Sequence, residues 1–528
     1  MLGALCILLP VAKNSTRRLK LPLNRPRKTA IAACTLMFVA LCLRCTPVVG
    51  QSTAAQGRDE KPLASSSIPA ERLAQYADLA VEWERQYLQV NTSNPPGNEA
   101  KAAVFFETIL DREGIENKVF EYAPGRANIW ACLPRSSGSQ ALSTSCEQDV
   151  RQSPPERRAI ILLSHEDVVT SDPARWRVPP FSAQIVDGAM YGRGAQDMKS
   201  EGLAQLVVMV MLKREHVALD RDVILLATAD EEVGDTGSEW MIANQRPLLN
   251  AEYLLTEGGE NLNQNGKAKF IGIDVAEKAP FWLTITATGR PGHGSRPIAD
   301  SAPNHLVQAL SKLAAYQTPL QVIPVVQEFF KAMAVYEPPA RAAYFRNINQ
   351  GLKDARFRQS LEQDPATNYL LRNTISLTML KGSEQTNVIP GVATANVDVR
   401  LLPGQDPKQF LEEIRKVVAT PNVTVEPESP EFRIANASSL DTPLYAAIKK
   451  VEAQYFPGAP VVPHMTSGYN ESQMYRALGT TCYGFSPYTA TAEEESTEHG
   501  DNERIRVEEL RRGFRVLYDV VTQIAAKN

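Results

Sequence analysis

Ala159-Ile-Ile-Leu-Leu-Ser-His-Glu-Asp167 is the stretch that decides the fold of this chain. A short run of mostly branched apolar residues is typical of a strand that is buried on both faces. Because side chains alternate along a strand, His165 and Asp167 should point the same way, whereas Glu166 should point away and is not expected to bind a metal. We expect His165 at the carboxyl end of the strand, where open α/β sheets bind their ligands.

Two later apolar runs also end on acidic residues. Residues 222–229 lead into Asp230-Glu231-Glu232, and residues 253–255 lead into Thr256-Glu257. Helical patterns separate these runs, at the strongly apolar residues 203–212 and at residues 238–249. Strands that alternate with helices predict a mostly parallel α/β sheet. The histidine and the carboxylates should therefore meet at one edge of that sheet.

The composition describes a globular protein of more than one domain. The chain has 528 residues, of which 43% are hydrophobic and 22% charged, so a large core is available. Its formal net charge of -4 is small, and the sequence has no strongly basic run beyond the amino-terminal segment. A nucleic-acid partner is therefore not expected.

The first 50 residues have the order of a targeting segment. Six Arg and Lys residues between positions 17 and 28 precede an apolar run at 29–43, and small residues follow. This order is typical of a secretory signal peptide, although an uncleaved amino-terminal anchor remains an alternative. We expect an exported protein, which would be periplasmic, secreted or membrane-anchored, with residues 51–68 as a Ser-, Ala- and Gln-rich linker.

Cysteine usage agrees with export. Four of the seven cysteines lie in the targeting segment, which leaves Cys132, Cys146 and Cys482. Cys132 and Cys146 bracket a serine-rich segment and could form a local disulfide in an oxidising compartment. Three scattered cysteines do not predict a zinc–thiolate site.

The pattern changes near residue 278. Alternating strands and one helix predict an antiparallel sheet with helices on one face, over residues 281–288, 374–380, 394–402, 408–418 and 423–427. The α/β pattern resumes near residue 432 and closes with a helix at 507–525. We therefore expect a catalytic domain formed by residues 69–277 and 431–528, with an inserted α+β domain at 278–430.

Six short motifs follow one another along the chain. They are Ser164-His165-Glu166-Asp167, Gly192-Arg193-Gly194-Ala195-Gln196-Asp197-Met198-Lys199, Asp230-Glu231-Glu232, Glu257-Gly258, Gly292-His293-Gly294-Ser295 and Glu498-His499-Gly500. In this order they resemble the M20 family of di-zinc metallopeptidases and aminoacylases. The chain is most similar to its carboxypeptidase S (Gly-X carboxypeptidase) and N-acyl-amino-acid hydrolase branch. The resemblance covers residues 70–528 and implies a zinc-exopeptidase-like catalytic domain with an inserted lid domain.

The resemblance also implies a metal centre. Asp197 would bridge two Zn²⁺ ions, and Co²⁺ or Mn²⁺ would suit the same ligands. His165 and Glu257 would bind one ion, and Glu232 and His499 the other. Two further residues would assist, Glu231 as the general base and Asp167 by orienting His165.

The inserted domain would contribute to substrate binding. His293 matches a family histidine that helps bind the scissile carbonyl oxygen, often in a partner subunit's site. Asn387 and Arg400 fall where family members bind the substrate's carboxylate. A role of His293 in the partner's site would require a homodimer, whereas the insertion at about residues 320–370 could cover the usual interface.

These roles imply a hydrolase that cleaves an amide bond beside a free carboxylate, in a small peptide or an N-acyl amino acid. A narrow dipeptidase or amino-acid deacylase is an alternative, and so is a noncatalytic zinc-binding relative that acts as a binding protein. Thr466-Ser467-Gly468-Tyr469-Asn470 departs from the family's usual Gly-Thr-Asp, which leaves the substrate selectivity of this segment open. The remaining histidines, expected to be structural or on the surface, are His216, His305 and His464.

Overall fold

The computed structural model describes residues 63–136, 145–430 and 432–527. The expected signal peptide or anchor and residues 51–62 of the expected linker lie outside these residues. Within the described chain, no helix combines the length and apolar character needed to cross a membrane.

The larger sheet has eight strands. Their order is β1 (Glu116–Ala123), β2 (Arg126–Leu133), β6 (Val223–Thr228), β3 (Ala159–His165), β7 (Ala251–Thr256), β19 (Thr481–Gly484), β10 (Ile271–Glu277) and β18 (Val461–Thr466). The four central strands β6, β3, β7 and β19 are parallel. At the two borders of this block, β2 is antiparallel to β6 and β10 is antiparallel to β19. The prediction of a mostly parallel, mixed sheet is confirmed.

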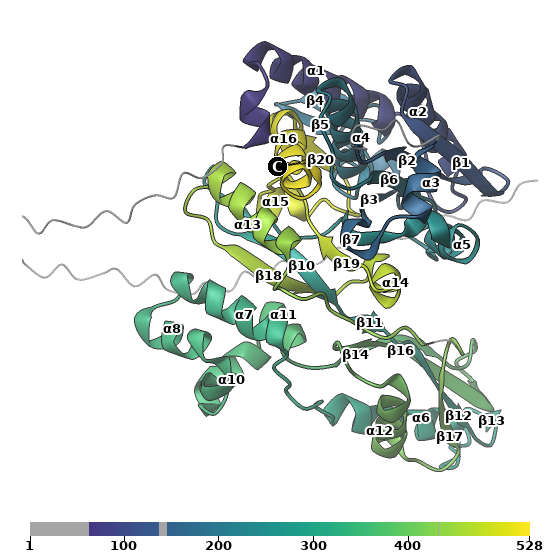
Figure 1. The fold of residues 1–528 in the computed structure, drawn as a ribbon. Helices are drawn as coiled ribbons and strands as arrows, with labels where there is room; N and C mark the ends of the chain where they lie inside the picture. The colour runs from purple at the N-terminus through teal and green to yellow at the C-terminus, as the bar shows by residue number, and fades with distance from the viewer. Residues whose placement is uncertain (1–62, 137–144, 431, 528) are drawn as a thin grey trace, which may run out of the picture. The chain divides into compact units, whose positions relative to one another are not determined.

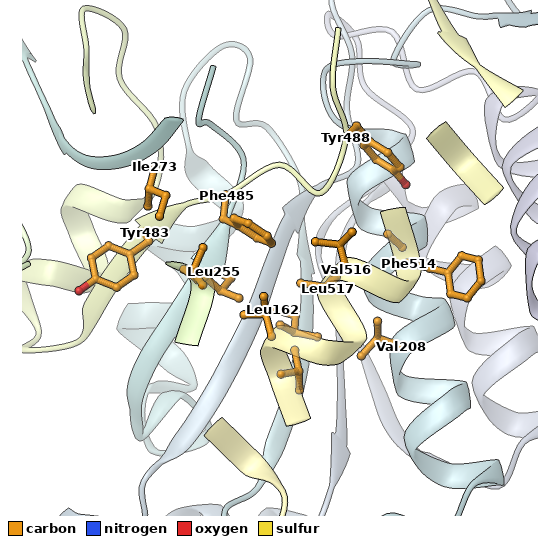
Figure 2. Packing of buried hydrophobic residues seen from close by; sticks show 14 of the residues in the cluster. Leu162, Val208, Leu255, Ile273, Tyr483, Phe485, Tyr488, Phe514, Val516 and Leu517 are labelled. Atoms are coloured by element: carbon orange, nitrogen blue, oxygen red, sulfur yellow. The ribbon is translucent and has the colours of Figure 1, made fainter. Parts of the chain in front are cut away.

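Strand β3 is buried on both faces, as its sequence predicts. Ile160 and Leu162 pack into the core formed with α1 (Ala70–Leu88), α4 (Lys199–Arg214) and α16 (Val507–Ala525). Ile161 and Leu163 face the opposite core, which Trp130 also enters. Figure 2 shows Leu162 meeting side chains of α4 and α16 in the first of these cores. Strand β3, which carries His165, is thus packed between two apolar cores.

A second, antiparallel sheet forms the inserted domain (Figure 1). Its strands are β11 (Ala279–Pro280), β16 (Val392–Leu401), β12 (Leu283–Thr288), β17 (Val423–Pro427) and β14 (Thr374–Lys381). Helices α6 (Ala302–Ala315) and α12 (Pro407–Val418) pack against it and share its separate core. Since β10 of the first sheet ends at Glu277 and β11 begins at Ala279, the change of sheet coincides with the expected boundary.

Strands β10 and β18 were not predicted from the sequence. Asp274 and Glu277 interrupt the apolar pattern of β10, and Pro463 and His464 interrupt that of β18. These polar side chains are nevertheless accommodated, because Asp274 bonds to His464 and Glu277 pairs with Arg476 at 2.7 Å. A strand that contains buried polar pairs of this kind lacks the apolar periodicity by which strands are predicted from a sequence.

One expected helix is shorter than its pattern indicated. The expected helix at residues 238–249 is α5 (Thr236–Asn244) followed by a separate 3-10 turn, Arg246–Leu249. Pro247 lies in that turn and has no N–H to continue the α-helical hydrogen bonds.

Cys132 and Cys146 form the disulfide that the sequence allowed, with a sequence separation of 14. Closing a loop of about 15 residues stabilises a fold by about 3 kcal/mol in the chain-entropy model. We therefore expect a Cys132→Ala, Cys146→Ala variant to lose about that much free energy of unfolding, measured by urea denaturation without reductant. Equal unfolding free energies for variant and wild type would contradict this assignment.

Candidate active site

His165 and two carboxylates form a first group of possible metal ligands. His165 ends β3 and is buried, and its Nε2 atom lies 2.9 Å from Asp197 Oδ1 and 3.3 Å from Glu257 Oε2. Glu257 directly follows β7, the parallel neighbour of β3. The adjacent carboxyl ends of these strands therefore bring the histidine and the glutamate together, as predicted.

A second group shares Asp197. The Nε2 atom of His499 lies 2.7 Å from Asp197 Oδ2 and 3.1 Å from Glu232 Oε2. In each group the candidate ligand atoms lie within 4.8 Å of one another. Asp197 thus directs one carboxylate oxygen at each histidine. All five residues expected to bind metal are brought together by the fold.

The donor set of these groups suits two divalent ions. Each group offers one imidazole nitrogen and two carboxylates, ligands that zinc, cobalt and manganese accept. Burial and the charge of Asp197 raise the pKa of Glu257 to about 8. Hydrogen bonds to Asp197 and Glu232 raise the pKa of His499 to about 11. The protons held by Glu257 and His499 are therefore bound to the same atoms that would bind a metal ion.

Asp167 joins His165 to the loop that follows β6. The Nδ1 atom of His165 lies 3.0 Å from the main-chain oxygen of Asp167 and 3.6 Å from its carboxylate. That carboxylate accepts hydrogen bonds from the N–H groups of Glu231, at 3.0 Å, and Glu232, at 3.2 Å. Asp167 therefore contacts the ring of His165 and also fixes the two glutamates of the neighbouring strand.

Glu231 and four of the candidate ligands line one cavity of about 540 Å³. The four are Asp197, Glu232, Glu257 and His499. Burial and the charge of Glu257 raise the pKa of Glu231 well above its ordinary value. Such a carboxylate is a stronger base than an exposed one, which suits proton abstraction in the cavity.

Two residues that position the site were missed in the sequence. Glu503 accepts hydrogen bonds from the N–H groups of Gly194 and Gln196, at 3.0 and 2.7 Å, and pairs with Arg193. Asn94 donates from Nδ2 to both Asp167 and Asp230. An arginine that is buried inside a tight glycine loop needs a carboxylate partner, so the sequence indicated that such a partner exists but not that it is Glu503.

Gly194 is required by the shape of this loop. Its φ angle is +90°, and a Cβ atom there would lie 2.7 Å from Cγ1 of Val168. Any larger residue would therefore both strain the backbone and displace the loop that carries Asp197.

The predicted substrate residues lie in the inserted domain, away from this cavity. Strand β13 (Gly292–His293) pairs with β15 (Val388–Ile389), and the N–H of Gly294 donates to the carbonyl of Asn387 at 2.7 Å. Arg400 pairs with Asp398 at 2.8 Å. The described residues that line the cavity include none of His293, Asn387 and Arg400. The fold joins His293 to Asn387, and their roles stay predictions.

The other acidic and histidine side chains differ in their settings. Glu166 is fully buried and belongs to neither ligand group. His216 is exposed, and His305 bonds through Nδ1 to the carbonyl of Thr288 at 2.7 Å. His464 lies in the cavity wall, where it bonds to Asp274.

Sequence comparisons place this chain among known relatives. The model for Peptidase family M20/M25/M40 matches residues 161–523. Human N-fatty-acyl-amino acid synthase/hydrolase PM20D1 is 29% identical over 70% of this chain and 75% of its own length. Rat aminoacylase-1A is 27% identical over 84% of this chain and 94% of its own length.

Solved structures share the fold. A metallo-carboxypeptidase of the M20 family from Sulfolobus solfataricus, Sso-CP2, has a TM-score of 0.61 at 18% identity, covering 84% of this chain and 98% of its own. Human carnosine dipeptidase 1 has a TM-score of 0.55 at 16% identity, covering 86% and 99%. The family match spans well over half of the sequence and confirms the resemblance seen in the six motifs. The chain belongs to the M20 peptidase family and is an enzyme of its metallopeptidase and amidohydrolase type.

Proposed function

We propose that this enzyme uses two divalent metal ions, zinc in the simplest case, to hydrolyse an amide bond beside a free carboxylate in N-acyl amino acids. The observation that carries the proposal is the shared carboxylate of Asp197, whose two oxygens face His165 and His499. Similarity to PM20D1 and aminoacylase-1A supports this substrate class. Asp197, His165 and Glu257 would hold one ion, and Asp197, Glu232 and His499 the other.

The protein would use its own groups to move protons. Two bound metal ions would supply the Lewis acidity that makes a water molecule nucleophilic at neutral pH. Glu231, which lines the cavity, would accept a proton from that water and pass it to the leaving nitrogen. Asp167 would keep Glu231 in place through the hydrogen bond from its main-chain N–H.

The described lining of the cavity offers no unpaired cation to the substrate's carboxylate. It includes three cations other than His499, and each already has an acidic partner. The pairs are His464 with Asp274 at 2.5 Å, Arg504 with Glu493 at 2.8 Å and Arg506 with Glu494 at 3.0 Å. Arg400 also has an acidic partner, Asp398 at 2.8 Å. The proposal that Asn387 and Arg400 of an inserted domain, from this chain or from a second copy, bind the carboxylate therefore rests on their match to the M20 family.

A dipeptidase is the second candidate, and the acidic side chains in the cavity wall favour it. Its wall includes Glu201, Glu260, Glu495 and Glu498, none of which is joined to a cation by an ion pair within the described chain. The glutamates of this wall can accept hydrogen bonds from the protonated amine of a dipeptide, an interaction that an apolar acyl group cannot make. The two candidate functions therefore differ in the group on the acyl side of the cleaved bond, which is an uncharged acyl group in one case and an amino acid with a protonated amine in the other.

Export is a further part of the proposal. The Cys132–Cys146 disulfide supports an oxidising compartment, where such bonds persist. It agrees with the signal-like order of the first 50 residues.

Metal affinity should increase with pH. At pH 7 the metal-free site holds protons, because the pKa of His499 is about 11 and that of Glu257 about 8. A bound ion must displace these protons, so the affinity should increase about tenfold per pH unit for each proton released. Cobalt titrations monitored by absorbance between pH 6 and pH 7.5 measure this slope. An affinity that is independent of pH would contradict the assigned ligand set.

Glu231→Gln should lower kcat at least about a hundredfold, because the amide cannot accept the proton of the attacking water. Metal content, measured by plasma mass spectrometry, should stay the same. Glu239→Gln is the matched control, since Glu239 is 56% exposed and lies in α5 outside the cavity. Equal activities of Glu231→Gln and wild type would refute the role of Glu231.

Hydrolysis of N-acetyl amino acids should depend on their free carboxylate. We expect methyl esterification to lower kcat/KM at least about tenfold, which corresponds to the loss of a charge-assisted hydrogen bond. Chromatography of the products from matched N-acetyl amino acids, their methyl esters and dipeptides measures this preference. Faster cleavage of the dipeptides than of the N-acetyl compounds would favour the dipeptidase. Equal rates for acid and ester would exclude carboxylate recognition.

A further inference from the structure

The long insertion of the second domain packs against the first sheet. It comprises α7 (Pro324–Met333), α8 (Pro339–Arg346), α9 (Ile348–Gly351), α10 (Ala355–Glu362), α11 (Pro365–Asn368) and the 3-10 turn η6 (Tyr369–Leu371). Helix α7 packs on β18, the edge strand of the first sheet (Figure 1). Its Val326 and Phe330 belong to the same apolar core as Leu162 of β3, and not to the core of the second sheet. The insertion thus packs as part of the domain that contains the first sheet and the candidate active site.

A chain of hydrogen bonds leads from this insertion to the metal-ligand loop. Tyr369 Oη lies 3.1 Å from Nε2 of His464, and Nδ1 of His464 lies 2.5 Å from Oδ1 of Asp274. The other oxygen of Asp274 accepts the N–H of Gly259 at 3.0 Å. Gly259 is two residues after the candidate ligand Glu257. Three side chains from three separate segments therefore connect the insertion to one ligand.

The arrangement of these groups leaves little room for movement. Asp274 and His464 are direct partners in the parallel pairing of β10 and β18, and Asp274 is buried. A Cβ atom on Gly258 would lie 2.6 Å from Oδ2 of Asp274, so the loop after Glu257 passes very close to this carboxylate. A shift of Asp274 would therefore displace the loop, and with it the carboxylate of Glu257.

The turn that carries Tyr369 has a second, independent anchor. The buried Lys278 donates to the main-chain oxygens of Tyr369 and Arg372, at 3.3 and 2.9 Å. Removal of the Tyr369 hydroxyl alone should therefore leave the insertion docked. This separation makes the hydrogen-bond chain testable without unfolding the insertion.

We propose that Tyr369, His464 and Asp274 are positioning residues that hold Glu257 in place for metal binding, so that the helical insertion forms part of the metal site. The inference rests on the proposed metal centre, and it assigns a role to a segment in which the sequence shows no motif. None of the three residues is among the candidate metal ligands, and Tyr369 does not line the cavity.

The test separates the two metal groups. His499→Ala leaves the His165–Asp197–Glu257 group intact, and Glu257→Ala leaves the Asp197–Glu232–His499 group. Tyr369→Phe is introduced into each of these backgrounds, and cobalt affinity is measured by titration of the metal-depleted protein. We expect about threefold weaker binding in the His499→Ala background and unchanged binding in the Glu257→Ala background. Substitution of a residue that directly contacts a metal ligand typically lowers metal affinity tenfold or more. A smaller effect is expected here, because Tyr369 acts on Glu257 only through His464, Asp274 and the main chain of Gly259.

A second variant tests whether the residues act as one chain. His464→Asn keeps a nitrogen donor near Asp274, because Nδ2 of asparagine takes the place of histidine Nδ1, but loses the contact with Tyr369. In the His499→Ala background, His464→Asn should weaken cobalt binding about as much as Tyr369→Phe does. The variant that combines His464→Asn with Tyr369→Phe should bind cobalt no more weakly than either single change. Tyr344→Phe is the matched control, because Tyr344 lies in α8 of the same insertion and contacts Phe357 by its ring.

The outcomes are distinct. Equal losses in both backgrounds, or none in either, would overturn the inference while leaving the metal centre intact. Additive losses in the double variant would show that Tyr369 and His464 act separately and would also overturn it. If the wild-type protein binds no metal, the proposed function fails instead.

Discussion

The site depends on one carboxylate shared by two histidines from distant parts of the chain. Asp197 lies between His165, at the end of β3, and His499, near the carboxyl terminus. Its position is set by the loop before α4. The N–H groups of this loop donate hydrogen bonds to Glu503, which lies shortly before the closing helix in the sequence. Two domain segments separated by the inserted sheet must therefore fold together before the shared carboxylate has both of its partners.

The sequence predicted those parts of the fold that follow apolar periodicity. Strand β3 and the acidic residues after β6 and β7 were placed correctly because parallel strands carry their carboxyl ends to a common edge. Strands β10 and β18 were missed because Asp274, Glu277 and His464 break the apolar pattern. Their partners lie far away in sequence, so only the folded chain shows why these polar groups can be buried.

Most candidate ligands were predictable for a similar reason, whereas the residues that hold them were not. Four of the five end or follow a buried strand or lie in a glycine-rich loop, which are local signals. His499 has neither context and was predicted from the motif Glu498-His499-Gly500, which resembles that of the family. Asn94 and Glu503 have no such context and act through hydrogen bonds to other segments. Arg400 belongs to a sheet with its own core, and His293 to a separate pair of short strands, β13 and β15. The relation of both residues to the cavity therefore depends on how the second domain meets its substrate. Sequence motifs alone do not contain that information.

The central claim is that Asp197 bridges two metal ions. Anomalous diffraction at the zinc absorption edge from crystals grown with Zn²⁺ tests it most directly. The account predicts two peaks about 3.5–4 Å apart, one on each side of Asp197, the first beside His165 and Glu257 and the second beside Glu232 and His499. A single peak, or peaks that do not flank Asp197, would contradict it.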